Sequence, residues 1–191
     1  MSRTFLAFAA TLLLAASAAA QESWKLDPAH SSAQFSVRHL GISTVRGAFT
    51  KVSGSAQFDE ANPGKSSVQA TIDAASVDTR VEMRDKDLRS PNFLDVEKYP
   101  TITFQSKKVE AAGQGKLKVT GDLTIHGVTK EVLLDVDGPS AAMKDPWGNM
   151  RRGASATTKI SRKDFGVNGA PMAVGDDITV TLDIEMIQAA K

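Results

Sequence analysis

The chain has 191 residues, with 23 Lys and Arg, 22 Asp and Glu, and no Cys. The lack of cysteine excludes disulfides, thiol catalysis, zinc–thiolate sites and iron–sulfur clusters. A net charge near zero disfavours nucleic acid as a partner, because that binding depends on a basic surface.

Residues 1–20 have the features of a secretory signal peptide. They carry one charge, at Arg3, followed by an apolar run and the small residues Ala18-Ala19-Ala20. The run is too short to span a bilayer and no second long apolar run follows, so we expect no transmembrane segment. We expect cleavage before Gln21, which leaves residues 21–191 as one domain with 22 basic and 22 acidic residues.

Alternation with a period of two dominates the chain after residue 31. Apolar and polar side chains alternate in nine runs, which is typical of half-buried antiparallel strands. The connection His126-Gly127 predicts a two-residue hairpin loop. The runs cover residues 33–39, 44–49, 56–58, 68–74, 102–104, 117–125, 128–136, 154–160 and 178–186.

Residues 81–90 break the alternation and are rich in helix formers. They predict a short helix between two strands, capped at its start by Asp78-Thr79 and followed by Pro91. Eight or nine strands in one domain form a sandwich or a barrel, and we favour the barrel because closure removes unpaired sheet edges. Charges at mid-strand, such as Arg46 and Lys118, favour a barrel with its polar face in water and its apolar face inside.

Several blocks along the chain resemble the YceI-like family, lipocalin-like barrels of bacterial periplasms that bind polyisoprenoids. The resemblance covers residues 24 to about 187 and depends on the order and spacing of the blocks together. The most specific are WKLDPAHS at 24–31, FSVRHL at 35–40, YPTITF at 99–104 and GDLTIHGVTK at 121–130.

The resemblance implies an all-β fold, an antiparallel lipocalin-like barrel of about eight strands with a short helix between two of them. It implies a periplasmic protein whose lumen holds a long isoprenoid chain, the tail of a quinone or prenyl alcohol, for transport or storage. It implies neither catalysis nor a cofactor other than the bound lipid. Relatives often carry a large apolar residue at the position of Ala154. The small side chain would either widen the lumen locally or leave a space that a neighbouring strand fills.

We expect the wall of the lumen to be formed by large side chains on the apolar faces, together with one histidine. His39 shares a face with Phe35 and could donate a hydrogen bond to a quinone carbonyl or a prenyl hydroxyl. The alternative is that these residues fill a closed core and contact no ligand. The set is Phe35, Val37, His39, Phe49, Phe58, Ile72, Phe104, Leu123, Val132, Leu134, Phe165, Ile178, Val180 and Leu182.

Other functions are weaker alternatives. The sequence has no nucleophile elbow, HExxH, P-loop or dinucleotide motif, so an enzyme acting on a lumen-bound lipid would depend on residues such as His39 or Arg84. We favour a structural role for Arg84-Asp85, which would fix the helix over the barrel end.

The sequence also bears on metal ions and protein partners. The three histidines, His30, His39 and His126, could hold a metal ion, but we expect no metal site. A homodimer, or a membrane electron-transfer partner that receives quinone, would be a further partner. We expect Trp147 to pack against the barrel end, with a partner or membrane contact as the alternative.

Overall fold

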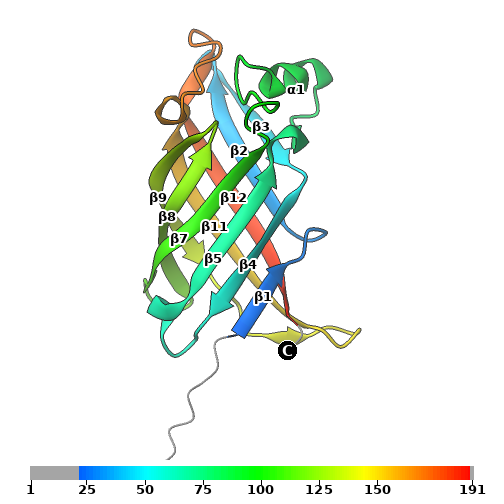
Figure 1. The fold of residues 1–191 in the computed structure, drawn as a ribbon, viewed down its shortest axis with the longest axis vertical. Helices are drawn as coiled ribbons and strands as arrows, with labels where there is room; N and C mark the ends of the chain where they lie inside the picture. Colours follow the sequence, from blue (N-terminus) through cyan, green and yellow to red (C-terminus); the bar gives the residue numbers. More distant parts are fainter. Residues whose placement is uncertain (1–21, 190–191) are drawn as a thin grey trace, which may run out of the picture.

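Twelve β-strands and one α-helix arrange residues 22–189 into a tall barrel (Figure 1). These are the residues that the structure, a computed structural model, describes, and the predicted signal peptide lies outside them. The elements are β1 (Glu22–Leu26), β2 (Ser32–His39), β3 (Ser43–Phe49), β4 (Val52–Phe58), β5 (Ser67–Asp73), β6 (Val77–Asp78), α1 (Glu82–Arg89), β7 (Thr101–Ala111), β8 (Lys116–Ile125), β9 (Val128–Asp137), β10 (Met143–Lys144), β11 (Met150–Ser161) and β12 (Val174–Gln188).

Eight strands close into a ring in which every neighbouring pair is antiparallel. The order around the ring is β1-β4-β5-β7-β8-β9-β11-β12, and β12 returns to β1. The long strand β12 pairs with β2 over its first part and with β1 over its last residues, so the β2–β3 hairpin extends one wall of the barrel. The predicted antiparallel barrel with one helix is confirmed.

The two faces of each strand meet different surroundings. On the outer face, Lys107 lies 3.2 Å from Asp122 and 2.9 Å from Glu131, and Lys118 lies 3.1 Å from Asp135. The alternate residues of the same strands turn their apolar side chains inward, as the period of two requires. The apolar face is therefore inside the barrel, as the sequence predicts.

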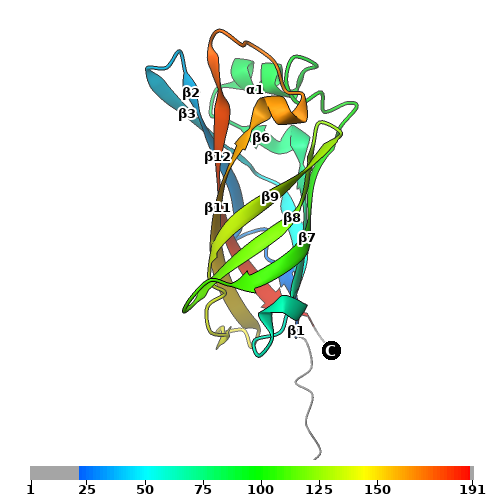
Figure 2. The ribbon, with the colours of Figure 1, turned by 90° about the vertical axis from the view of Figure 1, so that its left-hand side faces the viewer.

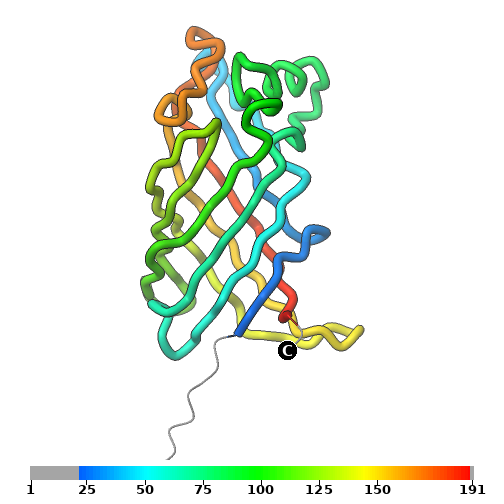
Figure 3. Tube along the Cα trace, viewed as in Figure 1, coloured from blue at the N-terminus to red at the C-terminus, as the bar shows by residue number. Residues whose placement is uncertain are grey.

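Different segments cover the two ends of the barrel (Figures 2 and 3). At one end, which we call the α1 end, lie α1 and the 3₁₀ turn η3 (Arg162–Phe165). At the other, the β10 end, the chain that precedes β11 runs across the opening beside β1. The long strands that run between the two ends have 10–15 residues, and a different segment covers each end.

The helix matches its predicted range, but its predicted cap is wrong. The residue before the helix is Val81, and no side chain caps the first turn. Thr79 does not accept hydrogen bonds from the main-chain N–H groups of the helix, as a cap would. Instead, the buried carboxylate of Asp85, in the helix, accepts from the main-chain N–H and the hydroxyl of Thr79. Arg84 donates to the hydroxyl and carbonyl oxygens of Thr79 as well. This pair therefore fixes α1 to the barrel, as the structural interpretation of Arg84-Asp85 predicts.

The prediction for Trp147 is wrong, because its side chain is 81% exposed. The loop before β11 is held from within by Asp145, whose carboxylate accepts from the main-chain N–H groups of Trp147 and Asn149. A turn fixed in this way presents the indole to solvent instead of folding it onto the barrel end.

Candidate functional site

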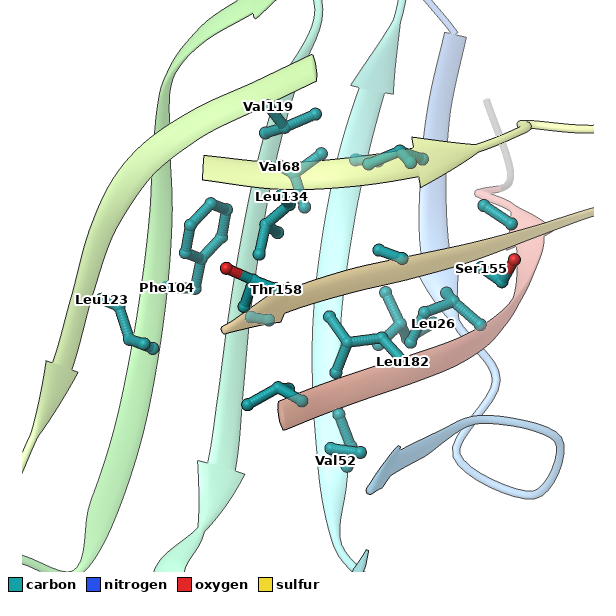
Figure 4. A pocket seen from close by; sticks show the side chains of 18 of the residues that line it. Leu26, Val52, Val68, Phe104, Val119, Leu123, Leu134, Ser155, Thr158 and Leu182 are labelled. Carbon is teal, nitrogen blue, oxygen red and sulfur yellow. The ribbon is translucent and has the colours of Figure 1, made fainter. Parts of the chain in front are cut away.

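The barrel encloses an apolar cavity, here called the lumen, that runs along much of its axis (Figure 4). Its volume is about 220 Å³. Residues from all eight ring strands and from β2 and β3 line it, and nearly all the surface they present is carbon. Arg152 is the one charged residue among them.

Ten of the predicted wall residues line the lumen. Their side chains occupy inward positions of the alternating strands, and Figure 4 shows Phe104, Leu123, Leu134 and Leu182 projecting into the space from different sides of the ring. The ten are Phe35, Phe49, Phe58, Ile72, Phe104, Leu123, Val132, Leu134, Val180 and Leu182. Their contact with a ligand stays a prediction.

Four predicted residues lie elsewhere, because the lumen ends before the α1 end. Phe165 is buried in a cluster with Phe93 and Val167 at this end of the barrel. Ile178 is half-buried on the inward face of β12, beyond the last residues of that strand that border the lumen. Val37 and His39 line a second pocket instead.

This second pocket, here called the α1 pocket, lies beneath α1 and has a volume of about 260 Å³. Its wall combines apolar side chains with Arg38, His39, Arg84 and Asp87, and it shares Phe35 with the lumen. The Phe35 ring lies so close to Gly47 that a Cβ there would come within 2.5 Å of it. The glycine therefore allows Phe35 to stand between the two spaces.

Small residues also border the lumen, and the predicted set of large side chains left out two of them, Ala70 and Ala156. Ala70, Ala154 and Ala156 all border it. Each lies on the same alternating face as a predicted wall residue of its strand or of a neighbour, so the period of two is the signal that identifies them. Ala154 lines the lumen, so the small side chain at this position does face the cavity.

The β10 end of the lumen is closed by Trp24, Phe58 and Arg152. The guanidinium carbon of Arg152 lies 5.2 Å from the centroid of the Trp24 ring and 5.1 Å from that of Phe58. Its Nη2 lies 3.3 Å from a carboxylate oxygen of Glu60 and 3.7 Å from one of Glu22. Cation–π contacts and two carboxylates thus hold the charge at the edge of an apolar space. Sequence reasoning missed Arg152, because a charged residue is usually assigned to solvent.

A second arginine, Arg151, points to the other side of β11 and binds three acids. It donates to Asp27 and Asp145 over 2.7 Å each and also to Glu185. The hydrogen bonds from His30 and Arg151 lower the pKa of Asp27 to about 2. Arg151 also holds the pKa of Asp145 well below its usual range, and Asp145 in turn raises that of Arg151.

Within residues 22–189, one group has the donor atoms and spacing to hold a metal ion: Asp27, His30 and Glu185. The Arg151 guanidinium already bonds both of its carboxylates, so a cation there would meet a positive charge. The three histidines lie in different places: the His126 ring meets the Tyr99 ring edge-on with centroids 4.5 Å apart, and His39 lines the α1 pocket.

Residues 22–189 contain no helix that combines the length and the apolar character needed to cross a bilayer.

Comparison with known proteins gives consistent results over nearly the whole chain. Residues 24–186 match the YceI-like domain. A UPF0312 protein of Vibrio parahaemolyticus is 43% identical over 166 residues, which is 86% of each chain. A UPF0312 protein of Vibrio cholerae is 41% identical over 160 residues, covering 84% of this chain and 83% of the relative.

Solved structures share the fold. BcnA of Burkholderia cenocepacia aligns with a TM-score of 0.74 and 27% identity, over 84% of this chain and 98% of its own. The YCEI protein of Campylobacter jejuni aligns with a TM-score of 0.71 and 35% identity, over 80% and 90%. A polyisoprenoid binding domain from Saccharophagus degradans aligns with a TM-score of 0.66 over 88% and 100%, and at 17% identity this likeness concerns the fold alone.

Proposed function

The chain belongs to the YceI-like family, and from that premise we propose that its lumen binds the hydrocarbon chain of an isoprenoid lipid. The observation that carries the proposal is the apolar lining of a cavity enclosed by a charged barrel. The polyisoprenoid binding domain of Saccharophagus degradans has the same fold, which supports this class of ligand.

The free energy of such binding comes from removing hydrocarbon from water. Each buried CH₂ contributes about 0.8 kcal/mol, so a tail of about ten carbons gains on the order of 8 kcal/mol. Immobilising the chain offsets several kcal/mol of that gain. An isoprenoid therefore needs few polar contacts to bind, which fits a wall with a single charged side chain.

The proposed role is transport or storage of the lipid in the periplasm. The predicted leader at residues 1–20 supports export, and the family resemblance supports the compartment. We propose binding and not turnover, because acid–base catalysis needs a titratable group at the reacting atom, and the lumen wall offers arginine, glutamine, serine and threonine as its polar residues.

The test is to fill the lumen without changing the outside of the barrel. Ala154→Trp places a large ring in the cavity, whereas Thr157→Trp adds the same ring to an exposed position of the same strand. We expect uptake of a C20 prenyl alcohol to fall at least tenfold for Ala154→Trp and to be unchanged for Thr157→Trp, with both variants folded by circular dichroism. Equal uptake by all three proteins would place the lipid outside the lumen and end the proposal.

A further inference from the structure

The exposed apolar side chains of the barrel gather at the α1 end. Eight large hydrophobic residues are exposed in the part of the chain that the structure describes, and five of them lie on the segments at this end. The five are Leu40 and Ile42 at the turn of the β2–β3 hairpin, Val81 and Met83 at the start of α1, and Met172 in the loop before β12. Single exposed apolar residues need no explanation, but a cluster of them marks a surface that contacts another molecule.

Three of these side chains form one patch, here called the tip patch: Leu40, Ile42 and Met172. The main-chain N–H of Leu40 donates to the carbonyl of Ala173 over 2.7 Å, so the hairpin turn lies against the loop that carries Met172. The exposed fractions of the three residues are 57%, 81% and 92%. Figure 2 shows the hairpin and the loop before β12 reaching the end of the barrel beside α1. The patch therefore stands on protruding turns.

The turn that presents the tip patch is held in place by hydrogen bonds. Arg38 donates to the carbonyl of Gly41 over 2.6 Å and to the hydroxyl of Thr44 over 2.9 Å. Leu40 has a φ of 50°, a left-handed conformation that is costly for a bulky residue. An exposed leucine in this conformation adds nothing to folding, which points to a role in contact with another molecule.

The charge around the tip patch is positive. Residues 32–49, which form the hairpin, carry Arg38 and Arg46 and no acidic residue, and residues 166–175 carry no charge. The two acidic residues that follow this loop are both paired with lysines, at 2.9 Å and 2.6 Å. Arg38 bonds to two uncharged oxygens, and Arg46 is exposed. Residues 77–89, across the α1 pocket, carry four basic and four acidic residues and add no net charge.

We propose that the tip patch docks on the surface of a phospholipid bilayer that contains anionic lipids. The apolar side chains enter the headgroup region, and Arg38 and Arg46 meet the lipid phosphates. A second copy of the chain is the poorer occupant, because a symmetric contact joins the same patch of both copies and brings their arginines together. A lipid surface deforms around separate apolar turns, and its charge is opposite to that of the hairpin.

Docking at this end of the barrel brings the bilayer next to the α1 pocket. The wall of that pocket includes Val37 and His39 from the hairpin and Ala173 from the loop, and it shares Phe35 with the lumen. An isoprenoid tail is insoluble in water, so a protein that binds one takes it from a membrane or returns it there. This consequence rests on the proposed function, whereas the docking is measured without any isoprenoid.

The experiment measures binding to lipid vesicles by flotation. The vesicles consist of equal parts phosphatidylcholine and phosphatidylglycerol, or of phosphatidylcholine alone. All proteins are purified in the form that the cell exports, so that residues 1–20, where present, contribute equally to wild type and variants. Circular dichroism establishes that each variant is folded.

Two pairs of variants separate the tip patch from the rest of the surface. Met172→Ser removes an apolar side chain from the patch, and Met143→Ser makes the same change at an exposed methionine of the β10 end. Arg46→Gln removes a charge from the hairpin, and Lys116→Gln removes one from an exposed site at the start of β8. Ile42→Ser tests the hairpin turn itself.

We expect wild type to bind the mixed vesicles more tightly than phosphatidylcholine alone. Ile42→Ser and Met172→Ser should each weaken binding to the mixed vesicles about tenfold, because one apolar side chain is lost from the lipid contact. Arg46→Gln should weaken it about fivefold, the effect of one cation near an anionic surface. The controls Met143→Ser and Lys116→Gln should stay within about twofold of wild type.

Tryptophan fluorescence reports which end meets the lipid. Ile42→Trp combined with Trp147→Phe places an indole in the tip patch and removes the exposed one of the β10 end. Brominated lipids should quench the emission of this double variant, because bromine quenches indoles at short range. They should leave the emission of Trp147 in wild type unchanged. Quenching of Trp147 instead would overturn the proposed docking surface.

Three further results would overturn it: no binding of wild type to the mixed vesicles, equal binding by Met172→Ser and Met143→Ser, or a dimer that Ile42→Ser dissociates. Uptake of the C20 prenyl alcohol from dilute ethanol is measured separately. Uptake without vesicle binding ends the docking proposal and leaves the proposed function standing. Vesicle binding without uptake ends the proposed function and leaves the docking surface standing.

Discussion

Two buried arginines, one at each end of the barrel, have opposite surroundings. Arg162, at the α1 end, is 5% exposed and Arg152, at the β10 end, is 6% exposed. Arg162 donates from Nε, Nη1 and Nη2 to four main-chain carbonyls, at distances of 2.8–3.0 Å. Arg152 makes one hydrogen bond, to Glu60, and its Nε has no partner.

The difference separates an end that is closed by many hydrogen bonds from an end that borders the lumen. The carbonyls that Arg162 binds belong to Val167, Gly169, Val174 and Gly175, so this side chain holds the loop between η3 and β12 over the solid Phe165 cluster. Arg152 borders the lumen, and its Nε makes no hydrogen bond. Equal burial therefore does not indicate equal function, because the number of satisfied donors distinguishes the two arginines.

The largest expected effect is on the free energy of unfolding, and it tests the difference between the two arginines directly. Arg162→Met leaves four carbonyls without their donor, and we expect the free energy of unfolding to fall by about 3–5 kcal/mol. The same change at Arg152 should cost about 1 kcal/mol or less, because its partner Glu60 is exposed and a methionine can pack between two aromatic rings. Urea unfolding of both variants measures the difference. Equal losses would contradict the distinction between the two ends.

A second prediction compares the solid end with the lumen wall. Phe165→Ala opens a cavity in a filled cluster and should cost about 3–4 kcal/mol of unfolding free energy. Phe104→Ala removes a ring that already borders empty space, so we expect a loss of about 2 kcal/mol or less. Thermal and urea unfolding report the stabilities. A larger loss at Phe104 would indicate that the lumen is filled when the protein folds.

The smallest effect concerns pH and the ion pairs around Arg151. Because the folded pKa of Asp27 is about 2, below its unfolded value, its ionised form stabilises the protein at pH above about 4. This stabilisation is lost as the pH falls from about 4 towards 2. We expect Asp27→Asn to show a shallower decrease in Tm over that range than wild type. Asp137→Asn, at an exposed site on β9, should follow the wild-type curve, and a wild-type curve for Asp27→Asn would exclude this role for Asp27.

The sequence predicted the barrel and much of the lumen wall because strand alternation determines which face a side chain occupies. Phe104, Leu134 and Leu182 follow from that rule alone. The sequence did not predict the position at which the lumen ends, since Phe165 closes the α1 end from a turn outside the strands. It did not predict the burial of Arg152 either, because that burial depends on Trp24 and Phe58, which come from other strands.

The most direct test of lumen binding is a crystal structure of the protein with the C20 prenyl alcohol. We predict one continuous tube of density inside the barrel, in contact with Phe104, Leu134 and Leu182. Density on the outer surface, or an interior occupied by side chains alone, would contradict the account.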